Sequence, residues 1–477
     1  KVLTDRDGDG QYDEATIFLD GLTFPTGVFP WRDGIIVTSS PEILFAKDTD
    51  GDGVADVREV LYSGFVESNP QHRVNGFEYG LDNWLYLASG ASSGDILCTK
   101  TGETVNISSR DLRIQPDTGA LEPLSGHSQY GRSRDDWNRW FGNTNSQPLF
   151  QYVVEDGDLR RNPYVAAPTA KVYLTTPATA PPVYPTSRTI DRFNDLHAAN
   201  RFTSACSPHA VRDDRFGAEG AVFICEPVHN LVSRVVTTSA GIPLDGLRHP
   251  GETESEFLSS SDNWFRPVRM LTAPDGSVWL CDMYRHVIEH PQWIPEAWQA
   301  KLDLYAGFNR GRIWRIRRAD RTAQAAPDLA SLSSAELVKE LTSPNGWRRD
   351  TAERLLIARA AADDAVIAAI GDIVTSADDP RVQAQAAWTL AALKPTALDL
   401  SPLLTSDVPE AVAAGVQIAR SHESLHQQLT QVDLAGHDDI RVRFAVALAM
   451  GDLPADERSG TLTRLAISDH GDAWMRA

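Results

Sequence analysis

Hairpin-like patterns recur along the first two thirds of the chain. Residues 80–87 read GLDNWLYL and residues 273–280 read APDGSVWL, so each has a polar turn followed by a short run of alternating apolar and aromatic residues. Residues 33–37, DGIIV, form a looser third copy. Turns of this composition ahead of such runs predict β-hairpins. Repeated hairpins favour a β-propeller, because each blade is a small antiparallel sheet that buries its faces only against its neighbours.

The pattern becomes helical from Ser333 onward. Ser333 and Glu336 form a capping box ahead of an apolar stretch. Four similar Ala-, Leu- and Val-rich segments then follow at spacings of about 30 residues. They begin near residues 347, 380, 409 and 439. A helix-pair repeat of that length predicts a HEAT-like solenoid, and an irregular helical domain is the alternative.

We therefore expect a multidomain protein, β first and α second. Residues 1–318 are predicted to form the β-propeller, with six blades, and residues 319–332 a polar linker. Residues 333–477 are predicted to form HEAT-like repeats. Because the chain begins inside an acidic loop pattern and stops inside a helical one, we expect a fragment of a longer protein with a truncated solenoid.

Charge and cysteine content narrow the function classes. The formal net charge of −20 disfavours nucleic acid and anionic membranes as partners. No apolar run approaches the ~20 residues of a membrane span. The four cysteines form no Cys-x-x-Cys, which argues against a structural zinc site and against haem attachment within this span. Cys206 and Cys225 either pair across neighbouring strands, in an oxidising compartment, or stay as buried free thiols.

Two acidic loops have the spacing of a calcium-binding loop. Residues 48–59 place carboxylates at positions 1, 3, 5, 9 and 12 and a glycine at position 6. Residues 5–13 repeat the first nine positions, but Thr16 stands at position 12, so weaker binding is expected. Strand-like flanks favour structural calcium clips over EF-hands, and an acidic turn without metal is the alternative. The expected ligands are Asp48, Asp50, Asp52, Asp56, Glu59, Asp5, Asp7, Asp9 and Asp13.

His72 lies just ahead of the first hairpin, on a loop expected at one end of the propeller channel. An isolated histidine is most often structural, but an imidazole also suits general-base chemistry near neutral pH. The spacing from His72 to Gly80, Asp82 and Tyr86 resembles the His-x7-Gly-x-Asp-x3-Tyr stretch of soluble quinoprotein glucose/sorbosone dehydrogenases. Those are six-bladed propellers that hold pyrroloquinoline quinone (PQQ) over the channel. The resemblance implies that His72 takes the proton from the anomeric hydroxyl of a sugar while hydride passes to the quinone. Asn75 stands where that pattern has a glycine, so we expect a reshaped loop.

Longer motifs resemble a related family, the predicted membrane-bound dehydrogenases of planctomycetes and related bacteria. In those proteins a propeller is followed by HEAT repeats and a haem-binding Cys-x-x-Cys-His domain. The resemblance implies a periplasmic or cell-surface location and electron transfer to a haem c domain outside this fragment. The matching segments are residues 75–86, 129–132, 161–163, 204–206, 225–232, 261–267 and 282–291.

The resemblance to PQQ enzymes also directs attention to cationic groups. PQQ has three carboxylates and a quinone oxygen that gains negative charge, and arginines can bind both. The expected cofactor-binding residues are Arg73, Asn75, Arg266, Arg269 and Arg285. The alternative for the arginines is ion pairing with nearby carboxylates. We expect Glu226, His229 and Asn230 to line the channel as substrate contacts or as an acid/base pair. His286 and His290, four residues apart, could share a helix face and bind a metal.

The leading expectation is a quinoprotein-type dehydrogenase that oxidises a sugar or related alcohol, with calcium in structural sites. The alternative is a non-catalytic, calcium-stabilised module that binds glycan or protein. A third hypothesis is a lactonase-like calcium site built from Asn75, Asn230 and Glu226. Convergence of the arginines on His72 would favour the dehydrogenase.

Overall fold

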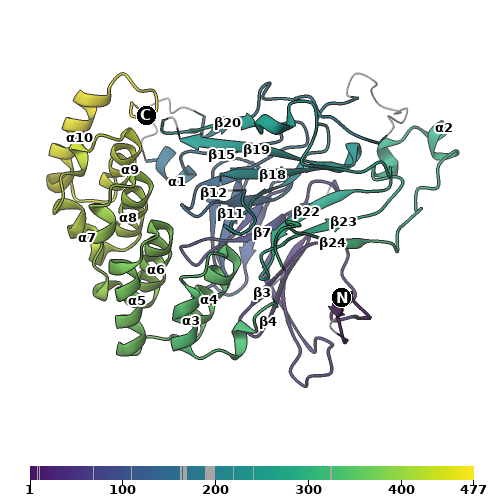
Figure 1. Ribbon diagram of the computed structural model, residues 1–477, viewed down its shortest axis with the longest axis horizontal. Helices are drawn as coiled ribbons and strands as arrows, with labels where there is room; N and C mark the ends of the chain where they lie inside the picture. The colour runs from purple at the N-terminus through teal and green to yellow at the C-terminus, as the bar shows by residue number, and fades with distance from the viewer. Residues whose placement is uncertain are drawn as a thin grey trace. The chain divides into compact units, whose positions relative to one another are not determined.

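Figure 1 shows a computed structural model of the chain. It describes all residues except 8, 10, 68, 109, 162–163, 165–168, 188–198, 219, 240, 323–324 and 477. The chain divides into two compact units. The first consists of residues 1–78 and 84–131, and the second of residues 79–83 and 132–477.

The first unit is built from antiparallel sheets. A two-stranded hairpin pairs β1 (Val2–Thr4) with β2 (Glu14–Thr16). A six-stranded sheet has the order β10-β9-β6-β5-β4-β3, and a four-stranded sheet has the order β12-β11-β8-β7. The strands of these two sheets are β3 (Pro25–Trp31), β4 (Gly34–Ser39), β5 (Glu42–Lys47), β6 (Val57–Ser63), β7 (Asn75–Tyr79), β8 (Leu85–Ala88), β9 (Asp95–Cys98), β10 (Thr104–Asn106), β11 (Asp111–Gln115) and β12 (Ala120–Leu124).

The second unit continues with three more sheets, of orders β13-β14-β15-β16, β17-β18-β19-β20 and β22-β23-β24. A short strand, β21, pairs with β19. The strands are β13 (Arg132–Arg134), β14 (Trp140–Gly142), β15 (Phe150–Tyr152), β16 (Lys171–Tyr173), β17 (Cys206–Ala210), β18 (Ala221–Glu226), β19 (Leu231–Ser239), β20 (Leu244–Arg248), β21 (Leu258–Ser259), β22 (Pro267–Thr272), β23 (Val278–Asp282) and β24 (Arg312–Ile316). Two short α-helices, α1 (Asp156–Leu159) and α2 (Glu296–Gln299), interrupt them.

These sheets are the blades of a β-propeller, so the predicted fold class is confirmed for the first part of the chain. The prediction of six blades is wrong, since the described residues form five. Blade number could not be read from the hairpin repeats because the blades differ in size. They contain between three and six strands, and only some begin with the polar turn that the sequence repeats.

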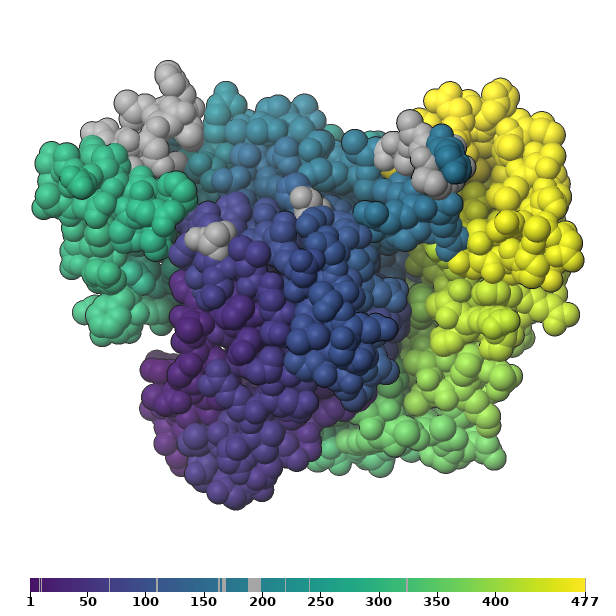
Figure 2. Space-filling model, turned by 180° about the vertical axis from the view of Figure 1, so that it is seen from behind, coloured from purple at the N-terminus to yellow at the C-terminus, as the bar shows by residue number. Residues whose placement is uncertain are grey.

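The C-terminal part of the second unit is helical, as predicted. The Ser333 capping box is present, with the Glu336 backbone N–H donating to the Ser333 hydroxyl. In Figure 1 the helices follow one another in chain order, from green to yellow, and the same colour order runs along this part of the surface in Figure 2. The α-helices are α3 (Ser334–Glu340), α4 (Gly346–Ala358), α5 (Asp364–Ser376), α6 (Pro380–Leu393), α7 (Ser401–Leu404), α8 (Pro409–Ser421), α9 (Ile440–Met450) and α10 (Ala455–Asp469). HEAT-like repetition stays a prediction.

Several 3-10 helices complete the fold: η2 (Pro227–His229), η3 (Pro250–Glu252), η4 (Pro291–Trp293), η5 (Leu329–Ser331), η6 (Pro395–Ala397), η7 (Glu423–Thr430) and η8 (Leu434–Gly436). Between β24 and η5 the described residues contain neither helix nor strand. The predicted domain limits at residues 318 and 333 stay predictions. Among the described residues no helix is both long and apolar enough to cross a membrane.

Candidate functional site

His72 lies in the first unit, on the loop between β6 and β7. Its backbone carbonyl accepts a hydrogen bond from the hydroxyl of Ser92, and its Nε2 lies 3.4 Å from the side-chain nitrogen of Gln129. Burial lowers the pKa of His72, and the nearby charge of His127 lowers it further, although a hydrogen bond to the backbone of Gly90 acts in the opposite direction. The imidazole is therefore neutral at pH 7, the form that accepts a proton.

Arg73, the next residue, has a side chain with few partners. Its Nη2 donates to the carbonyl of Glu67 (3.2 Å), and the guanidinium lies 4.6 Å from the ring centre of Phe24. Its Nε is buried and has no hydrogen-bond partner among the described residues. A buried, unsatisfied donor is costly, so this guanidinium has capacity for an anionic ligand.

Asn75 is occupied by the protein itself. Its Nδ2 donates to the carbonyls of Arg73 (2.8 Å) and Gln129 (2.9 Å), and its Oδ1 accepts from the backbone N–H of Gly131 (2.8 Å). The side chain is buried and fastens two loops together. The expectation that Asn75 binds the cofactor is thus not supported by its geometry, because its amide has no donor left for a ligand.

In the second unit, Arg266 connects two loops. Glu226 ends β18, the loop after β18 contains His229 and Asn230, and the loop after β23 contains Arg285. The guanidinium of Arg266 donates to four backbone carbonyls, those of Arg285 (2.9 Å), Pro227 (2.8 Å), Val228 (3.3 Å) and His286 (2.7 Å). The structure therefore brings Arg266 against both loops, and the role of these residues in a site stays a prediction. Arg266 itself positions the loops, and its bonds to carbonyls leave little capacity for a carboxylate.

Glu226 and His229 form a buried pair. The Glu226 Oε1 lies 3.0 Å from the His229 Nδ1 and 2.6 Å from the hydroxyl of Ser204. The other carboxylate oxygen accepts from the backbone N–H groups of Ser204 (2.9 Å) and Thr203 (3.3 Å). The His229 Nε2 accepts from the backbone N–H of Asn200 at 3.0 Å, so Nδ1 carries the ring proton. This arrangement holds the segment of residues 200–204 against the loop after β18.

Asn230 has a left-handed backbone conformation (φ 61°), and its Nδ2 donates to the carbonyls of Asn263 and Phe265. Asn230 and Glu226 are thus both held in internal hydrogen bonds. The lactonase-like calcium site, which needs their oxygen atoms facing an open channel, is not supported by this geometry.

Arg285 resembles Arg73 in its surroundings. Its Nη2 donates to the carbonyl of Leu304 (3.3 Å), and its Nε is buried without a hydrogen-bond partner in the described part of the chain. Arg269 lies on β22, opposite Cys281 of β23. Since His72 and Arg73 belong to one unit and the other arginines to the second, convergence of the arginines on His72 stays a prediction.

The expectation that His286 and His290 share a helix face is wrong. Tyr284 has a left-handed backbone conformation (φ 48°), and Pro291 disfavours a helical conformation at the residue before it. The chain between β23 and η4 is therefore not helical. The ring of His286 stacks on Trp264, with ring centres 5.8 Å apart, while the Nδ1 of His290 caps η4.

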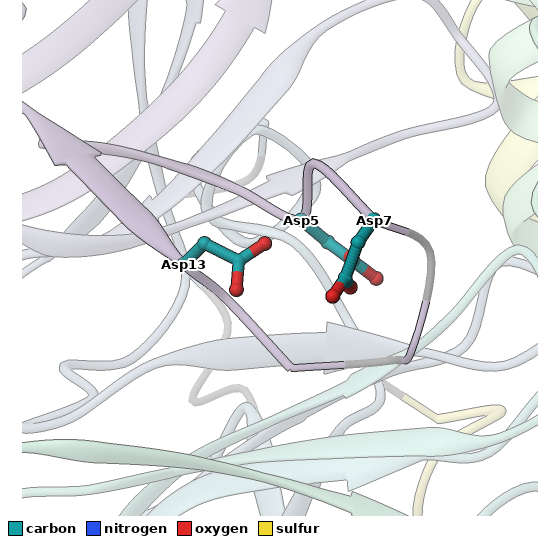
Figure 3. Close-up of side chains that lie close together, drawn as sticks. All are labelled: Asp5, Asp7 and Asp13. Carbon is teal, nitrogen blue, oxygen red and sulfur yellow. The ribbon is translucent and has the colours of Figure 1, made fainter.

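The first acidic loop joins β1 to β2 and brings three carboxylates together. Figure 3 shows Asp5, Asp7 and Asp13, each of which offers an oxygen within 4.8 Å of the others. Asp9 is not in this group, because its carboxylate accepts from the backbone and side chain of Gln11. The loop thus has strand flanks, as predicted, and gathers positions 1, 3 and 9.

The second acidic loop joins β5 to β6 and gathers positions 1, 3 and 5, which are Asp48, Asp50 and Asp52. Asp56 instead accepts from the backbone N–H of Thr49 (3.1 Å), and Glu59 lies within β6. Two backbone N–H groups, of Gly51 and Gly53, lower the pKa of Asp48 by donating to its carboxylate. The predicted closing ligand at position 12 therefore lies outside the cluster.

A cavity of about 170 Å³ lies elsewhere in the second unit, between propeller strands and α6. Its lining is charged but internally paired. Arg212 lies 2.7 Å from Asp136, and Arg381 lies 2.9 Å from Asp214. The cavity contains none of the predicted site residues, and its ion pairs have a structural role.

Sequence reasoning missed two contributors to the site. His127 influences the pKa of His72, and the Ser204 hydroxyl bonds to Glu226. Ser204 was part of a matched motif without an assigned role. His127 lies 55 residues from His72, and no spacing pattern connects the two.

Comparison with protein-family models identifies the chain. Residues 1–320, about two thirds of the sequence, match the model described as domain of unknown function DUF7133. The chain belongs to the DUF7133 family. No curated protein matches this DUF7133 chain.

Among solved structures, three matches are PQQ-type sugar dehydrogenases or proteins named as such. A proposed oxidoreductase (glucose dehydrogenase) of Thermus thermophilus is 12% identical, with 55% of this chain and 91% of that chain covered and a TM-score of 0.26. The PQQ-bound aldose sugar dehydrogenase of Streptomyces coelicolor is 14% identical, with 54% and 75% covered and a TM-score of 0.29. The PQQ domain of a Coprinopsis cinerea pyranose dehydrogenase is 10% identical, with 55% and 91% covered and a TM-score of 0.23. Superpositions this partial do not establish which reaction a DUF7133 chain performs.

Proposed function

We propose that this DUF7133 chain is a quinoprotein-type dehydrogenase that oxidises a sugar or related alcohol, with His72 as the general base. The observation that supports this most directly is the state of His72. Its imidazole is partly buried, neutral at pH 7 and hydrogen-bonded to the backbone of Gly90. The other ring nitrogen, 3.4 Å from the side-chain nitrogen of Gln129, is the one that would accept a proton from a substrate hydroxyl that replaces this contact.

The cofactor implied by the resemblance is PQQ, which would accept the hydride of the substrate. Two arginines, one in each unit, are separate candidates for its carboxylates. Arg73, beside His72, and Arg285 each have a buried Nε without a hydrogen-bond partner among the described residues. Each would bind a carboxylate through charge-assisted hydrogen bonds. Arg266 would hold the loops that carry Arg285 and His229, and Asn75 would hold the loop of His72.

The test is calorimetric titration of PQQ into the purified full chain with calcium present. Arg73→Ala, next to His72, should weaken binding about tenfold or more, since it removes a charge-assisted contact. Arg285→Ala tests the candidate of the second unit separately. Arg318→Ala, which removes an exposed arginine paired with Asp320, is the matched control. His72→Ala should retain binding but lose dye-linked turnover of aldoses. A folded, calcium-loaded chain that does not bind PQQ would reject the proposal.

The electron acceptor and location follow from the same resemblance. We propose that electrons pass to a haem c domain or cytochrome partner, and that the protein is located in the periplasm or at the cell surface. Reduction of a c-type cytochrome by the substrate-loaded chain, followed at the haem absorption band, tests the first part. Fractionation of the native host tests the second.

A second candidate function is a non-catalytic module that binds glycan or protein. The side chains of Asn75, Arg266 and Asn230 are occupied by backbone groups, as in a structural scaffold, and this observation favours it. Glycan binding that persists in the His72→Ala variant, together with no PQQ binding, would support this alternative.

We also propose that the two acidic loops bind calcium as structural clips. Each carries three clustered carboxylates at the turn of an antiparallel hairpin. Calcium takes six to eight oxygen ligands, so backbone carbonyls and water would complete the coordination.

A further inference from the structure

Cys206 and Cys225 face each other across two antiparallel strands. They are register partners in the pairing of β17 with β18. Directly opposed residues of an antiparallel pair have Cα atoms about 4.5–5.5 Å apart, which is within the range that a disulfide spans. Both cysteines are present as thiols in the structure, and both are buried.

The two cysteines are close along the chain to the Glu226–His229 pair and to its partner Ser204. Cys225 immediately precedes Glu226, and Cys206 follows Ser204 by two residues. The hydrogen bond between Ser204 and Glu226 (2.6 Å) thus connects the same two chain segments one step further along. A bulge follows Cys206, where Ser207 has a left-handed backbone conformation (φ 50°). Such a local irregularity re-aims side chains, and it occurs where the two thiols meet.

We propose that Cys206 and Cys225 form a disulfide that fastens the segment of residues 200–204 to the loop after β18. The site is a modification site for a small disulfide donor such as oxidised glutathione. The Cys225 thiolate attacks the donor and releases one glutathione, and the Cys206 thiolate then attacks the sulfur of Cys225 and releases the second. The two cysteines lose two protons and two electrons, and the donor is reduced to two thiols.

The remaining cysteines provide internal controls. Cys98 is also buried, but Tyr62 is its register partner on the neighbouring strand, so it has no opposed thiol. Cys281 lies on β23, close enough to Cys225 that Cys225 contributes to raising the pKa of Cys281. The register partner of Cys281 is nevertheless Arg269. The proposal therefore predicts one disulfide and two free thiols.

The test is peptide mapping of the full chain refolded in a buffer of oxidised and reduced glutathione. After denaturation and alkylation without reductant, we expect a linked pair of peptides containing Cys206 and Cys225, with Cys98 and Cys281 alkylated. Alkylation of all four cysteines would overturn the proposal, and so would a link that includes Cys281. Because both thiols are buried, the disulfide should form during folding and slowly or not at all in the folded, reduced chain.

Two further measurements compare the oxidised and reduced parent chain, so they do not depend on the folding of a variant. Reductant should lower the midpoint of thermal unfolding by several degrees, because the disulfide closes a loop of residues 207–224. Reduction should also speed the hydrogen exchange of the backbone N–H groups of Thr203 and Ser204, which donate to Glu226. Cys98→Ser should show the same two responses as the parent chain, whereas Cys206→Ser with Cys225→Ser should show neither. Equal exchange rates in oxidised and reduced protein would reject the fastening role.

Discussion

The Nη2 of Arg134, on β13, lies 2.8 Å from the carboxylate of Asp350, on α4. Arg134 is fully buried and also donates from Nε to the carbonyl of Tyr79 (2.6 Å). The same carboxylate accepts two hydrogen bonds from Arg212, which follows β17. One half-buried aspartate thus bridges two buried arginines of the propeller part, and it joins that part to the helical region within the second unit.

Asp350→Asn should destabilise the second unit strongly. Burial opposes the ionisation of Asp350, but Arg134 and Arg212 hold its pKa below the usual value, so the carboxylate is charged and paired. The substitution leaves the buried Arg134 guanidinium without its counter-charge, whereas Arg212 keeps its second partner, Asp136. Breaking a buried pair in this way costs about 3–5 kcal/mol. Thermal and denaturant unfolding of the full chain provide the measurement.

Asp433→Asn is the matched control for that experiment. Asp433 pairs with Arg464 at 2.9 Å, but both side chains are more than half exposed, and water screens exposed pairs. We expect little change in the unfolding midpoint. If Asp350→Asn and Asp433→Asn destabilise the chain equally, the contacts of Asp350 with Arg134 and Arg212 do not stabilise the second unit as described above.

Glu353 on α4 should make the stability of this junction fall as the pH rises. Burial raises the pKa of Glu353 well above its ordinary value of 4.5, and the charge of Asp350 raises it further. Above that ordinary value the carboxyl ionises in the unfolded chain but stays protonated in the folded chain, so the contribution to stability is lost with rising pH. Glu353→Gln, which imitates the protonated form, should gain stability relative to the parent chain between pH 5 and 8. A difference in unfolding free energy that does not vary over this range would contradict the assignment.

The hairpins could be predicted from sequence because their signals are local. Asn83 and Gly276 both have left-handed backbone conformations, with φ of 62° and 84°, at the turns that the polar residues marked. The two hairpins, β7 with β8 and β22 with β23, are therefore where residues 80–87 and 273–280 placed them. The number of blades was predicted wrongly because strands such as β9 and β10 extend a blade. Their pairing with that blade is not marked by a polar turn in the sequence.

In the candidate site, too, some features could be predicted from the sequence and others could not. Residue types and loop positions were predictable, and Arg266 indeed lies against the loops that carry Arg285 and His229. What its guanidinium binds was not predictable, since the four carbonyls it contacts lie up to 39 residues away, and any residue type offers a carbonyl. Ligand-binding arginines and loop-positioning arginines therefore look alike in sequence. A buried Nε without a hydrogen-bond partner among the described residues is found in Arg73 and Arg285, but also in Arg349, which pairs with Asp136.

His127→Gln should shift the acid limb of the pH–rate profile upward. The pKa of His72 is lowered from 6.5, first by burial and then by the charge of His127. The base form of His72 is thus present above a pKa that lies below 6.5, and turnover should fall as the pH drops through it. Removing His127 should move that midpoint toward 6.5. The same upward shift should appear in the pH–rate profile and in an NMR titration of the His72 ring.

His470→Gln, an exposed histidine at the end of α10, is the control for nonspecific effects. It should leave the midpoint unchanged. The NMR titration separates the electrostatic claim from the catalytic one, because it reports the pKa of His72 even if the chain proves inactive. A midpoint that does not move in the His127→Gln variant would show that the two rings do not interact.

Calcium removal should lower the midpoint of thermal unfolding, and added calcium should restore it, since an ion that binds only the folded chain stabilises it by mass action. Isothermal titration should detect two sites. Asp50→Asn keeps the oxygen that accepts from the backbone N–H of Asp52 (3.2 Å) but removes one of three clustered charges, so it should weaken one site about tenfold or more. Asp7→Asn should weaken the other. Asp372→Asn, an exposed carboxylate on α5, should change neither. Equal midpoints with calcium and with chelator would show that the acidic loops are turns without a metal, whose carboxylates are stabilised by backbone N–H groups such as those of Gly51 and Gly53.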